Sequence, residues 1–260
     1  MTDPRGERLE GRPVSPMTGV GSADHLKLFA AARVPVLQNR VYRSSREAMT
    51  APCGRLEIRF DQQSQFAWNA AFDPTRMQYD REYDNCVPSD RFYSYYDDLA
   101  DHLVQALGLA GGTVLDIGCG NGIFLSRWMG RMKQFRGIGV DPAYSGPASA
   151  CAGRLRFIAD TFRPKHVAMR PALILCRHLL EHVENPVEFL QRAAAAARAH
   201  DGIPLFVEVP DLDWILVNRA YWDFCYEHCN YFTADSLAFC MERAGMRVEE
   251  VSKAFGGQYL

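Results

Sequence analysis

A glycine-rich turn follows an apolar run near the middle of the chain. Residues 114–122 read VLDIGCGNG, and the apolar residues of Ile123 to Met129 that come next have helical spacing. This pattern predicts a buried strand, a tight turn and a helix. Glycine has no side chain to hold a ligand away from the backbone, so a nucleotide-like molecule can lie directly against such a turn.

The acid before the turn indicates what kind of ligand it binds. From Asp116 to Gly122 the spacing is Asp-x-Gly-x-Gly-x-Gly, whereas a dinucleotide fingerprint reads Gly-x-Gly-x-x-Gly. A pyrophosphate favours bare amides at a helix start, with no carboxylate beside it. Asp116 therefore favours a cationic or neutral ligand. S-adenosylmethionine, which has a sulfonium and an ammonium but no phosphate, is such a ligand.

Further apolar runs alternate with helical patterns along the rest of the chain. The runs cover residues 137–141, 156–160, 172–176 and 203–209. Strands that alternate with helices predict a parallel sheet whose ligands bind at the carboxyl ends of the strands. Asp141, 23 positions beyond Gly118, can accept hydrogen bonds from both ribose hydroxyls, and Asp160 can accept one from the adenine amino group. The alternative, a packed α/β domain without a ligand, leaves this ordered series of acids unexplained.

From Tyr95 onward the chain resembles the class I S-adenosylmethionine-dependent methyltransferases, through the glycine turn and the two acids that follow it. Within that superfamily it is similar to the sugar and natural-product C-methyltransferases, at residues 72–74 with 83–85, residues 177–182 (RHLLEH) and residues 226–232 (YEHCNYF). The resemblance implies an α/β fold with a doubly wound, mostly parallel seven-stranded sheet, preceded by an N-terminal arm and lid. It also implies S-adenosylmethionine as the cofactor and S-adenosylhomocysteine as the product.

The predicted cofactor site collects the residues of the turn and of the strand ends. It comprises Asp116, Gly118, Cys119, Gly120, Asn121, Gly122, Asp141, Pro142, Asp160, Thr161 and Arg177. Arg177 ends the fourth strand, where it can also bind a substrate phosphate or carboxylate, or pair with Glu181. The other predicted substrate contacts are Tyr83, His182, Asn230 and Tyr231.

Methyl transfer to a carbon or a hydroxyl group needs a base that takes the proton of the nucleophile. Tyr226, Glu227 and His228 place three proton-handling side chains in a row, within a long insertion at residues 211–235. In the C-methyltransferases that the chain resembles, the matching Glu-His pair is associated with the active site and the histidine is the proposed base. The family's tyrosine would fall at Cys225, so Tyr226 departs from the family pattern. The alternative is a hydrogen-bonded histidine that fixes the loop.

Residues 177–182 follow the fourth strand and supply two further histidines. His178 and His182 lie four positions apart and would share a helix face, and His178 is a further catalytic candidate. The spacing His-x-x-Glu-His also matches a zinc-peptidase helix. We reject that interpretation because no later acidic helix offers a third ligand, and we predict no metal site.

Charge and composition limit the classes of partner. The formal net charge of −2 gives the protein no overall field that attracts nucleic acid or anionic membranes. No run of about 18 apolar residues is present to span a membrane, and the N-terminus has no apolar signal core. These features predict a cytoplasmic protein whose partner is a small-molecule substrate, and they leave the oligomeric state open. The eight cysteines are then expected to be reduced thiols.

Composition shifts divide the N-terminal part of the chain. Residues 1–24 are rich in Gly, Pro, Ser and Arg and are expected to be a disordered lead-in. Residues 25–94 are expected to form the arm and lid, where the resemblance places a zinc module of paired Cys-x-x-Cys motifs. This region has only Cys53 and Cys86, so the module is degenerate here. The aromatic side chains of residues 61–90 either cover cofactor and substrate or pack the arm onto the sheet.

Residues 95–260 are expected to form the methyltransferase domain, in which residues 211–235 are an insertion that covers the substrate. Arg247 to Val251 alternates as a strand, and Gly256 to Leu260 should begin the final antiparallel strand. Related proteins continue into a further C-terminal domain, so the stop at Leu260 indicates a truncated or short member.

Together these patterns predict methyl transfer from S-adenosylmethionine to a small polar metabolite, with C-methylation of a sugar or natural-product intermediate as the preferred reaction. The same base would serve an oxygen nucleophile, so O- or N-methylation on the same fold stays open. A third alternative is a non-catalytic module that binds the cofactor or a partner protein.

Overall fold

The computed structural model describes residues 13–21, 24–38, 40–77, 89–200 and 202–260. The chain divides into two compact units, which we describe separately. The four-stranded unit comprises Met1–Gln78, Leu180–Gln191 and Val209–Leu260, and the six-stranded unit comprises Tyr79–Leu179 and Arg192–Glu208. The residues of helix α4 (Pro186–Arg198) belong partly to each unit.

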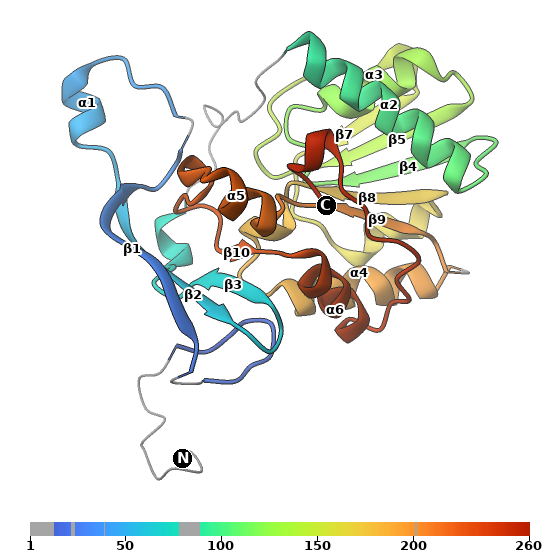
Figure 1. Ribbon diagram of the computed structural model, residues 1–260. Coiled ribbons are helices and arrows are strands. Elements are labelled where there is room, and N and C mark those ends of the chain that lie inside the picture. The colour runs from blue at the N-terminus through green and yellow to red at the C-terminus, as the bar shows by residue number, and fades with distance from the viewer. Residues whose placement is uncertain (1–12, 22–23, 39, 78–88, 201) are drawn as a thin grey trace. The chain divides into compact units, whose positions relative to one another are not determined.

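The six-stranded unit is built on a mostly parallel sheet with the order β6-β7-β5-β4-β8-β9 (Figure 1). Its strands are β4 (Gly112–Ile117), β5 (Phe135–Val140), β6 (Ser149–Ala150), β7 (Leu155–Ile158), β8 (Leu173–Arg177) and β9 (Leu205–Glu208). The pairs are parallel except for β6 with β7. The chain runs from β4 to one side of the sheet and returns to the other side through β8. Such a switch point is where open α/β sheets bind ligands.

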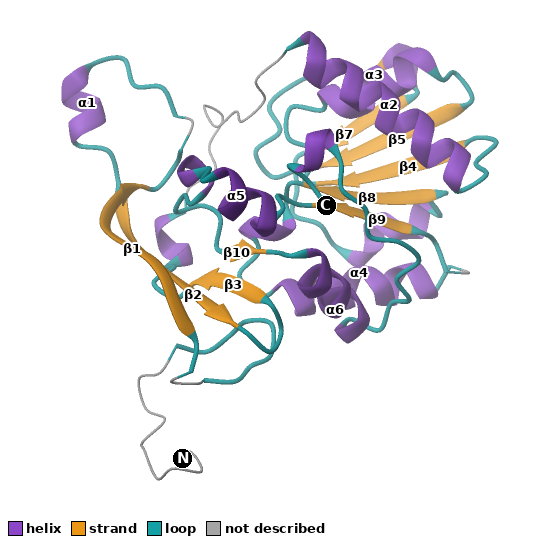
Figure 2. Ribbon diagram, viewed as in Figure 1, coloured by secondary structure: helices purple, strands orange, loops and turns teal. Residues whose placement is uncertain are grey.

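Helices α2 (Asp90–Ala106) and α3 (Ile123–Arg131) lie on one face of this sheet (Figure 2). The Ser89 hydroxyl begins α2 by accepting a hydrogen bond from the Phe92 amide at 3.2 Å. Apolar side chains of both helices pack with those of the strands into one core, in which Trp128 is 1% exposed. Short 3-10 helices, η2 (Cys151–Gly153) and η3 (Pro164–Met169), connect the later strands.

The four-stranded unit is built on an antiparallel sheet with the order β1-β2-β3-β10 (Figure 2). Its strands are β1 (Leu26–Pro35), β2 (Cys53–Asp61), β3 (Phe66–Asn69) and β10 (Asn230–Tyr231). Its helices are α1 (Ser45–Met49), α5 (Leu212–Asn218) and α6 (Ala234–Arg243), with the 3-10 helices η1 (Pro74–Arg76), η4 (Leu180–His182), η5 (Tyr221–Asp223) and η6 (Phe255–Gly257). Because β10 pairs with β3, the predicted insertion completes a sheet that begins in the predicted arm.

The structure confirms the predicted α/β class and the mostly parallel sheet, but the described sheet has six strands rather than the seven predicted. The alternating segment Arg247 to Val251 is not a strand, because no neighbouring strand pairs with it in the described part of the chain. Residues 256–260 do not form a full strand either. They make isolated bridges, in which Tyr259 pairs with Pro210 and with Ala254. Among the helices described, none combines the length and apolar character needed to cross a membrane.

Candidate functional site

The turn after β4 depends on its glycines. Gly118, Gly120 and Gly122 have φ angles of +74°, +54° and +76°, a left-handed region that other residues rarely adopt. A Cβ atom on Gly122 would lie 2.3 Å from the Phe157 ring, and one on Gly118 would lie 2.9 Å from the Leu179 side chain. The backbone of the predicted cofactor turn is therefore bare for both conformational and steric reasons.

The Asp141 carboxylate lies at this turn, as the sequence predicts for the residue that binds the ribose. Its Oδ2 accepts a hydrogen bond from the Gly120 amide at 2.9 Å, and its Oδ1 accepts one from the Ala143 amide at 2.8 Å. Burial raises the pKa of Asp141, and the two amides oppose that effect. Cys119, Asn121 and Pro142 lie within or beside the same two segments, β4–α3 and the residues after β5.

Asp116 lies on β4 and is only 3% exposed. Burial raises its pKa to about 7, although the charge of Arg177 acts in the opposite direction. Its Oδ1 atom is buried and has no hydrogen-bond partner among the described residues. A buried polar atom without a partner costs free energy, which an ammonium or sulfonium group beside it would offset. The carboxylates at this turn, those of Asp116 and Asp141, thus fit a cationic nucleoside.

Asp160, the predicted adenine acceptor, already has partners within its own loop. Its carboxylate lies 3.3 Å from the Arg163 guanidinium and 3.4 Å from the Lys165 ammonium, and it accepts a hydrogen bond from the Thr161 amide at 2.8 Å. Burial acts to raise the pKa of Asp160, but the hydrogen bond from Lys165 and the charge of Arg163 hold it below its usual value. The adenine contact of Asp160 and Thr161 stays a prediction.

Arg177, predicted to contact cofactor or substrate, is 7% exposed and paired inside the six-stranded unit. Its Nε and Nη2 atoms donate to the Glu208 carboxylate at 2.9 and 3.3 Å, and its guanidinium lies 4.1 Å from the centre of the Phe124 ring. Glu208, rather than the predicted Glu181, is therefore its carboxylate partner. This geometry favours a structural role for Arg177.

Glu208 also contacts the side chain of His178. Glu208 was not among the site residues predicted from the sequence. His178 has a φ angle of +47°, its Nε2 lies 2.8 Å from the Glu208 carboxylate, and its amide donates to the Glu208 carbonyl at 2.8 Å. Burial acts to raise the pKa of Glu208, but the charges of Arg177 and His178 outweigh it and lower the pKa to about 2. The sequence signal that could have identified Glu208 is its place near the end of the fifth predicted strand. Asp141 and Asp160 occupy the same place in earlier predicted strands.

The other candidate acid–base residues gather in the four-stranded unit. The rings of His182 and His228 are nearly perpendicular, with centroids 4.8 Å apart, and His182 Nδ1 lies 3.0 Å from the Glu227 carbonyl oxygen. The Glu227 side chain is 1% exposed and accepts a hydrogen bond from the Gln38 amide at 2.8 Å. Glu181, from η4, is 2% exposed beside them. Two segments that are distant in the sequence thus meet at His228.

Three predicted site residues use their polar groups within this unit. Tyr226 is fully buried, and its hydroxyl accepts from the Asp73 amide at 2.9 Å. The Tyr231 hydroxyl donates to the Cys225 carbonyl at 3.1 Å, and the Asn230 amide donates to the Val183 carbonyl at 2.6 Å. These contacts favour structural roles for all three residues. For Tyr226, the departure from the family pattern favours a structural role as well. Tyr83 lies outside the described residues.

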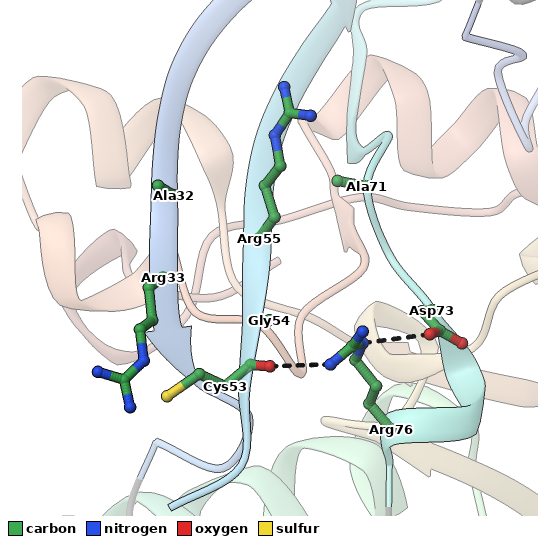
Figure 3. Close-up of a pocket in the computed structure, with 8 residues that line it drawn as sticks. All are labelled: Ala32, Arg33, Cys53, Gly54, Arg55, Ala71, Asp73 and Arg76. Carbon is green, nitrogen blue, oxygen red and sulfur yellow. Dashed lines mark hydrogen bonds and ion pairs between the residues drawn. The ribbon is translucent and has the colours of Figure 1, made fainter. Parts of the chain in front are cut away.

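A pocket of about 500 Å³ opens beside β2 and was not predicted (Figure 3). It is lined by Ala32, Arg33, Cys53, Gly54, Arg55, Ala71, Asp73 and Arg76. Arg76 donates to the Cys53 carbonyl at 3.1 Å and pairs with Asp73 at 3.1 Å (Figure 3). Of the three arginines that line the pocket, Arg76 pairs with Asp73 and Arg55 pairs with Glu57. A Cβ atom on Gly54 would lie 2.0 Å from the Tyr226 ring, so this ring packs directly against the pocket wall.

Residues 89–251 match the family model described as a methyltransferase domain. A 97-residue segment, 34% of this chain, is 33% identical to a ubiquinone biosynthesis O-methyltransferase of Psychrobacter arcticus and covers 37% of that protein. A second such enzyme, from an Azoarcus species, is 32% identical over 97 residues, which are 35% of this chain and 42% of that protein. The chain thus matches about two fifths of the length of these relatives.

Among solved structures, the N,N-8-amino-8-demethyl-D-riboflavin dimethyltransferase of Streptomyces davawensis is 19% identical, with a TM-score of 0.46. The alignment covers 65% of this chain and 52% of that one. This low similarity carries no information about the substrate or mechanism of the present chain.

Proposed function

Because this chain belongs to the methyltransferase domain family, we propose that it transfers the methyl group of S-adenosylmethionine to a small polar metabolite. The membership confirms the predicted methyltransferase family, and it supports S-adenosylmethionine as the cofactor. One observation in the structure gives the proposal its main support. The buried Asp116 carboxylate, one oxygen of which has no hydrogen-bond partner among the described residues, lies just before the glycine turn. The Gly120 amide of the same turn donates a hydrogen bond to Asp141.

The cofactor supplies a methyl group activated by its positively charged sulfur. The turn from Gly118 to Gly122 would let the nucleoside lie against the backbone, and the Asp141 carboxylate would accept the ribose hydroxyls. Asp116 would balance the positive charge of the methionine part.

His228 is the base that we propose for the acceptor, with Glu227 beside it. Histidine titrates near neutral pH, so it can remove a proton next to a carbonyl group, and the resulting enolate carbon can attack the methyl group. The Glu227 backbone carbonyl orients His182, which packs against the His228 ring. We propose C-methylation of a sugar or natural-product intermediate as the first candidate reaction.

O-methylation is the second candidate, and the two curated relatives support it because both are ubiquinone biosynthesis O-methyltransferases. The same base can deprotonate a hydroxyl group. The proposal includes a cytoplasmic location and no nucleic-acid partner, in keeping with the net charge of −2.

The test measures cofactor binding and product formation separately. Calorimetry with S-adenosylmethionine should show one binding site per chain. Incubation with the cofactor and a panel of nucleotide-linked keto-sugars and phenolic acids should release S-adenosylhomocysteine, and NMR with a carbon-13 methyl donor would locate the new methyl group. Failure to bind the cofactor would refute the proposal. Binding without turnover for any acceptor would favour the non-catalytic module instead.

A further inference from the structure

Three side chains in the four-stranded unit bring metal-ligating atoms together. Glu181 and His182 come from η4, and His228 comes from the loop that precedes β10. Each offers one ligand atom, and these three atoms all lie within 4.8 Å of one another. We refer to Glu181, His182 and His228 as the His–Glu cluster.

The hydrogen bonding of His182 sets the nitrogen that can act as a ligand. Its Nδ1 lies 3.0 Å from the Glu227 carbonyl oxygen, and a carbonyl oxygen only accepts hydrogen bonds. Nδ1 therefore carries the proton, and the lone pair is on Nε2. Histidine ligands of metal ions have this arrangement, because the second nitrogen donates to a carbonyl or carboxylate that orients the ring.

The charges around the cluster favour a cation. The Glu181 and Glu227 side chains are 2% and 1% exposed, and Glu227 Oε2 lies 4.0 Å from His182 Nδ1. Two buried carboxylates beside two imidazoles form an environment that favours a bound cation over a bound anion. Two nitrogen donors with one carboxylate form the ligand set that zinc takes in sites that keep a position open for another ligand. Ligand atoms around a tetrahedral zinc ion lie about 3.4 Å apart, so the three side chains would have to move closer together to hold the ion.

We propose that the His–Glu cluster binds one divalent transition-metal ion of the zinc class. The zinc-peptidase interpretation failed for want of a third ligand, and it included His178, whose ring is held by Glu208 in the six-stranded unit. The structure replaces His178 with His228, which the sequence places 46 positions after His182.

The proposal concerns the same histidine that the proposed function uses as a base, and its consequence rests on that function. A metal ion on His228 takes the lone pair that would accept the proton of the acceptor. Metal and proton therefore compete, and the bound ion inhibits methyl transfer. A chelator restores activity.

The test uses the full chain, stripped with a chelator and titrated with Zn²⁺ by calorimetry. Co²⁺ is the second probe, because its visible absorption reports nitrogen and oxygen ligation. We expect one ion per chain. His228→Gln and Glu181→Gln should each weaken the affinity at least about tenfold, since each removes a ligand. His102→Gln, which removes an exposed histidine from α2, is the matched control and should leave the affinity unchanged.

Two results would overturn the metal site: no stoichiometric binding of either ion, or wild-type affinity in His228→Gln. If Glu181→Gln does not fold, the His228 variant decides. Calorimetry of the same samples with S-adenosylmethionine tests the proposed function independently. A protein that binds the cofactor but no metal loses only the present inference.

Discussion

The two units of this molecule place their candidate functional groups in different ways. In the six-stranded unit, the glycine turn and Asp141 follow two strands in chain order, and the Gly120–Asp141 hydrogen bond joins residues 21 positions apart. In the four-stranded unit, the bond from Gln38 to Glu227 joins residues 189 positions apart, and the bond between Asp73 and Tyr226 spans 153 positions. Strand-end sites can thus be predicted from a local pattern, whereas the His228 region depends on long-range packing.

The acids of the six-stranded unit differ among themselves in an instructive way. Asp116 and Glu208 are both almost completely buried. The pKa of Asp116 is raised to about 7 by burial, whereas Arg177 and His178 lower the pKa of Glu208 to about 2. The first carboxylate is suited to receive a cation from outside the protein, and the second already has its cations.

The largest effect is expected for His228→Gln. This variant should change turnover, which the four-stranded unit is proposed to support, without changing cofactor binding by the six-stranded unit. Loss of the proposed base should lower kcat by about 10²- to 10⁴-fold, the range typical for a general base. The affinity for S-adenosylmethionine should not change, because the predicted cofactor residues belong to the six-stranded unit. Steady-state kinetics and calorimetry on the same sample measure both quantities. An unchanged kcat would remove His228 from the mechanism, and His102→Gln is the control.

Glu208→Gln should produce the largest loss of stability. It leaves Arg177 buried without its carboxylate, and breaking such a pair costs about 3–5 kcal/mol. Because its pKa is lower in the folded state than its usual value of 4.5, the stabilisation is complete above about pH 5. It disappears as the pH falls through 4.5 towards 2.

Denaturant unfolding at neutral and acidic pH measures this contribution. Glu249→Gln, in an exposed pair with Arg247, should change the free energy of unfolding by less than about 0.5 kcal/mol. Equal effects of the two substitutions would contradict the assignment of Glu208 as the residue that holds Arg177 and His178.

Gly122→Ala tests the turn itself. The methyl group would meet the Phe157 ring at 2.3 Å in a left-handed conformation, so we expect at least about 2 kcal/mol of destabilisation and weaker cofactor binding. Gly130→Ala is the control, because this helical glycine has nothing within 4 Å of its Cβ position. It should leave stability unchanged or raise it by up to about 1 kcal/mol. Thermal unfolding and calorimetry distinguish the two variants.

The smallest predicted effect is the pH dependence of cofactor binding. A cation favours the ionised form of Asp116, so binding should strengthen as this carboxyl loses its proton. With a pKa of about 7 in the free protein, the affinity should rise by about tenfold between pH 6 and pH 8. Asp116→Asn should bind more weakly and lose this dependence. A wild-type affinity that is flat over this range would show that Asp116 does not face the cofactor's charge.

Local sequence patterns were enough to predict the strand–turn–helix at residues 112–131, the succession of parallel strands along the chain and the position of Asp141 at the glycine turn. These features follow from local spacing, because the side chains that matter lie at the ends of successive strands. Those patterns did not reveal that Arg177 is buried against Glu208, or that Arg247 to Val251 has no partner strand among the residues that the structure describes.

The tertiary structure also pairs the insertion with the arm through β3 and β10, and it brings Glu181 and His182 close to His228. Periodicity reports which face of an element is buried, but not which distant element covers it. The free energy that selects such a partner comes from packing and charge pairing between segments far apart in the chain. No window of the sequence contains both sides of those contacts.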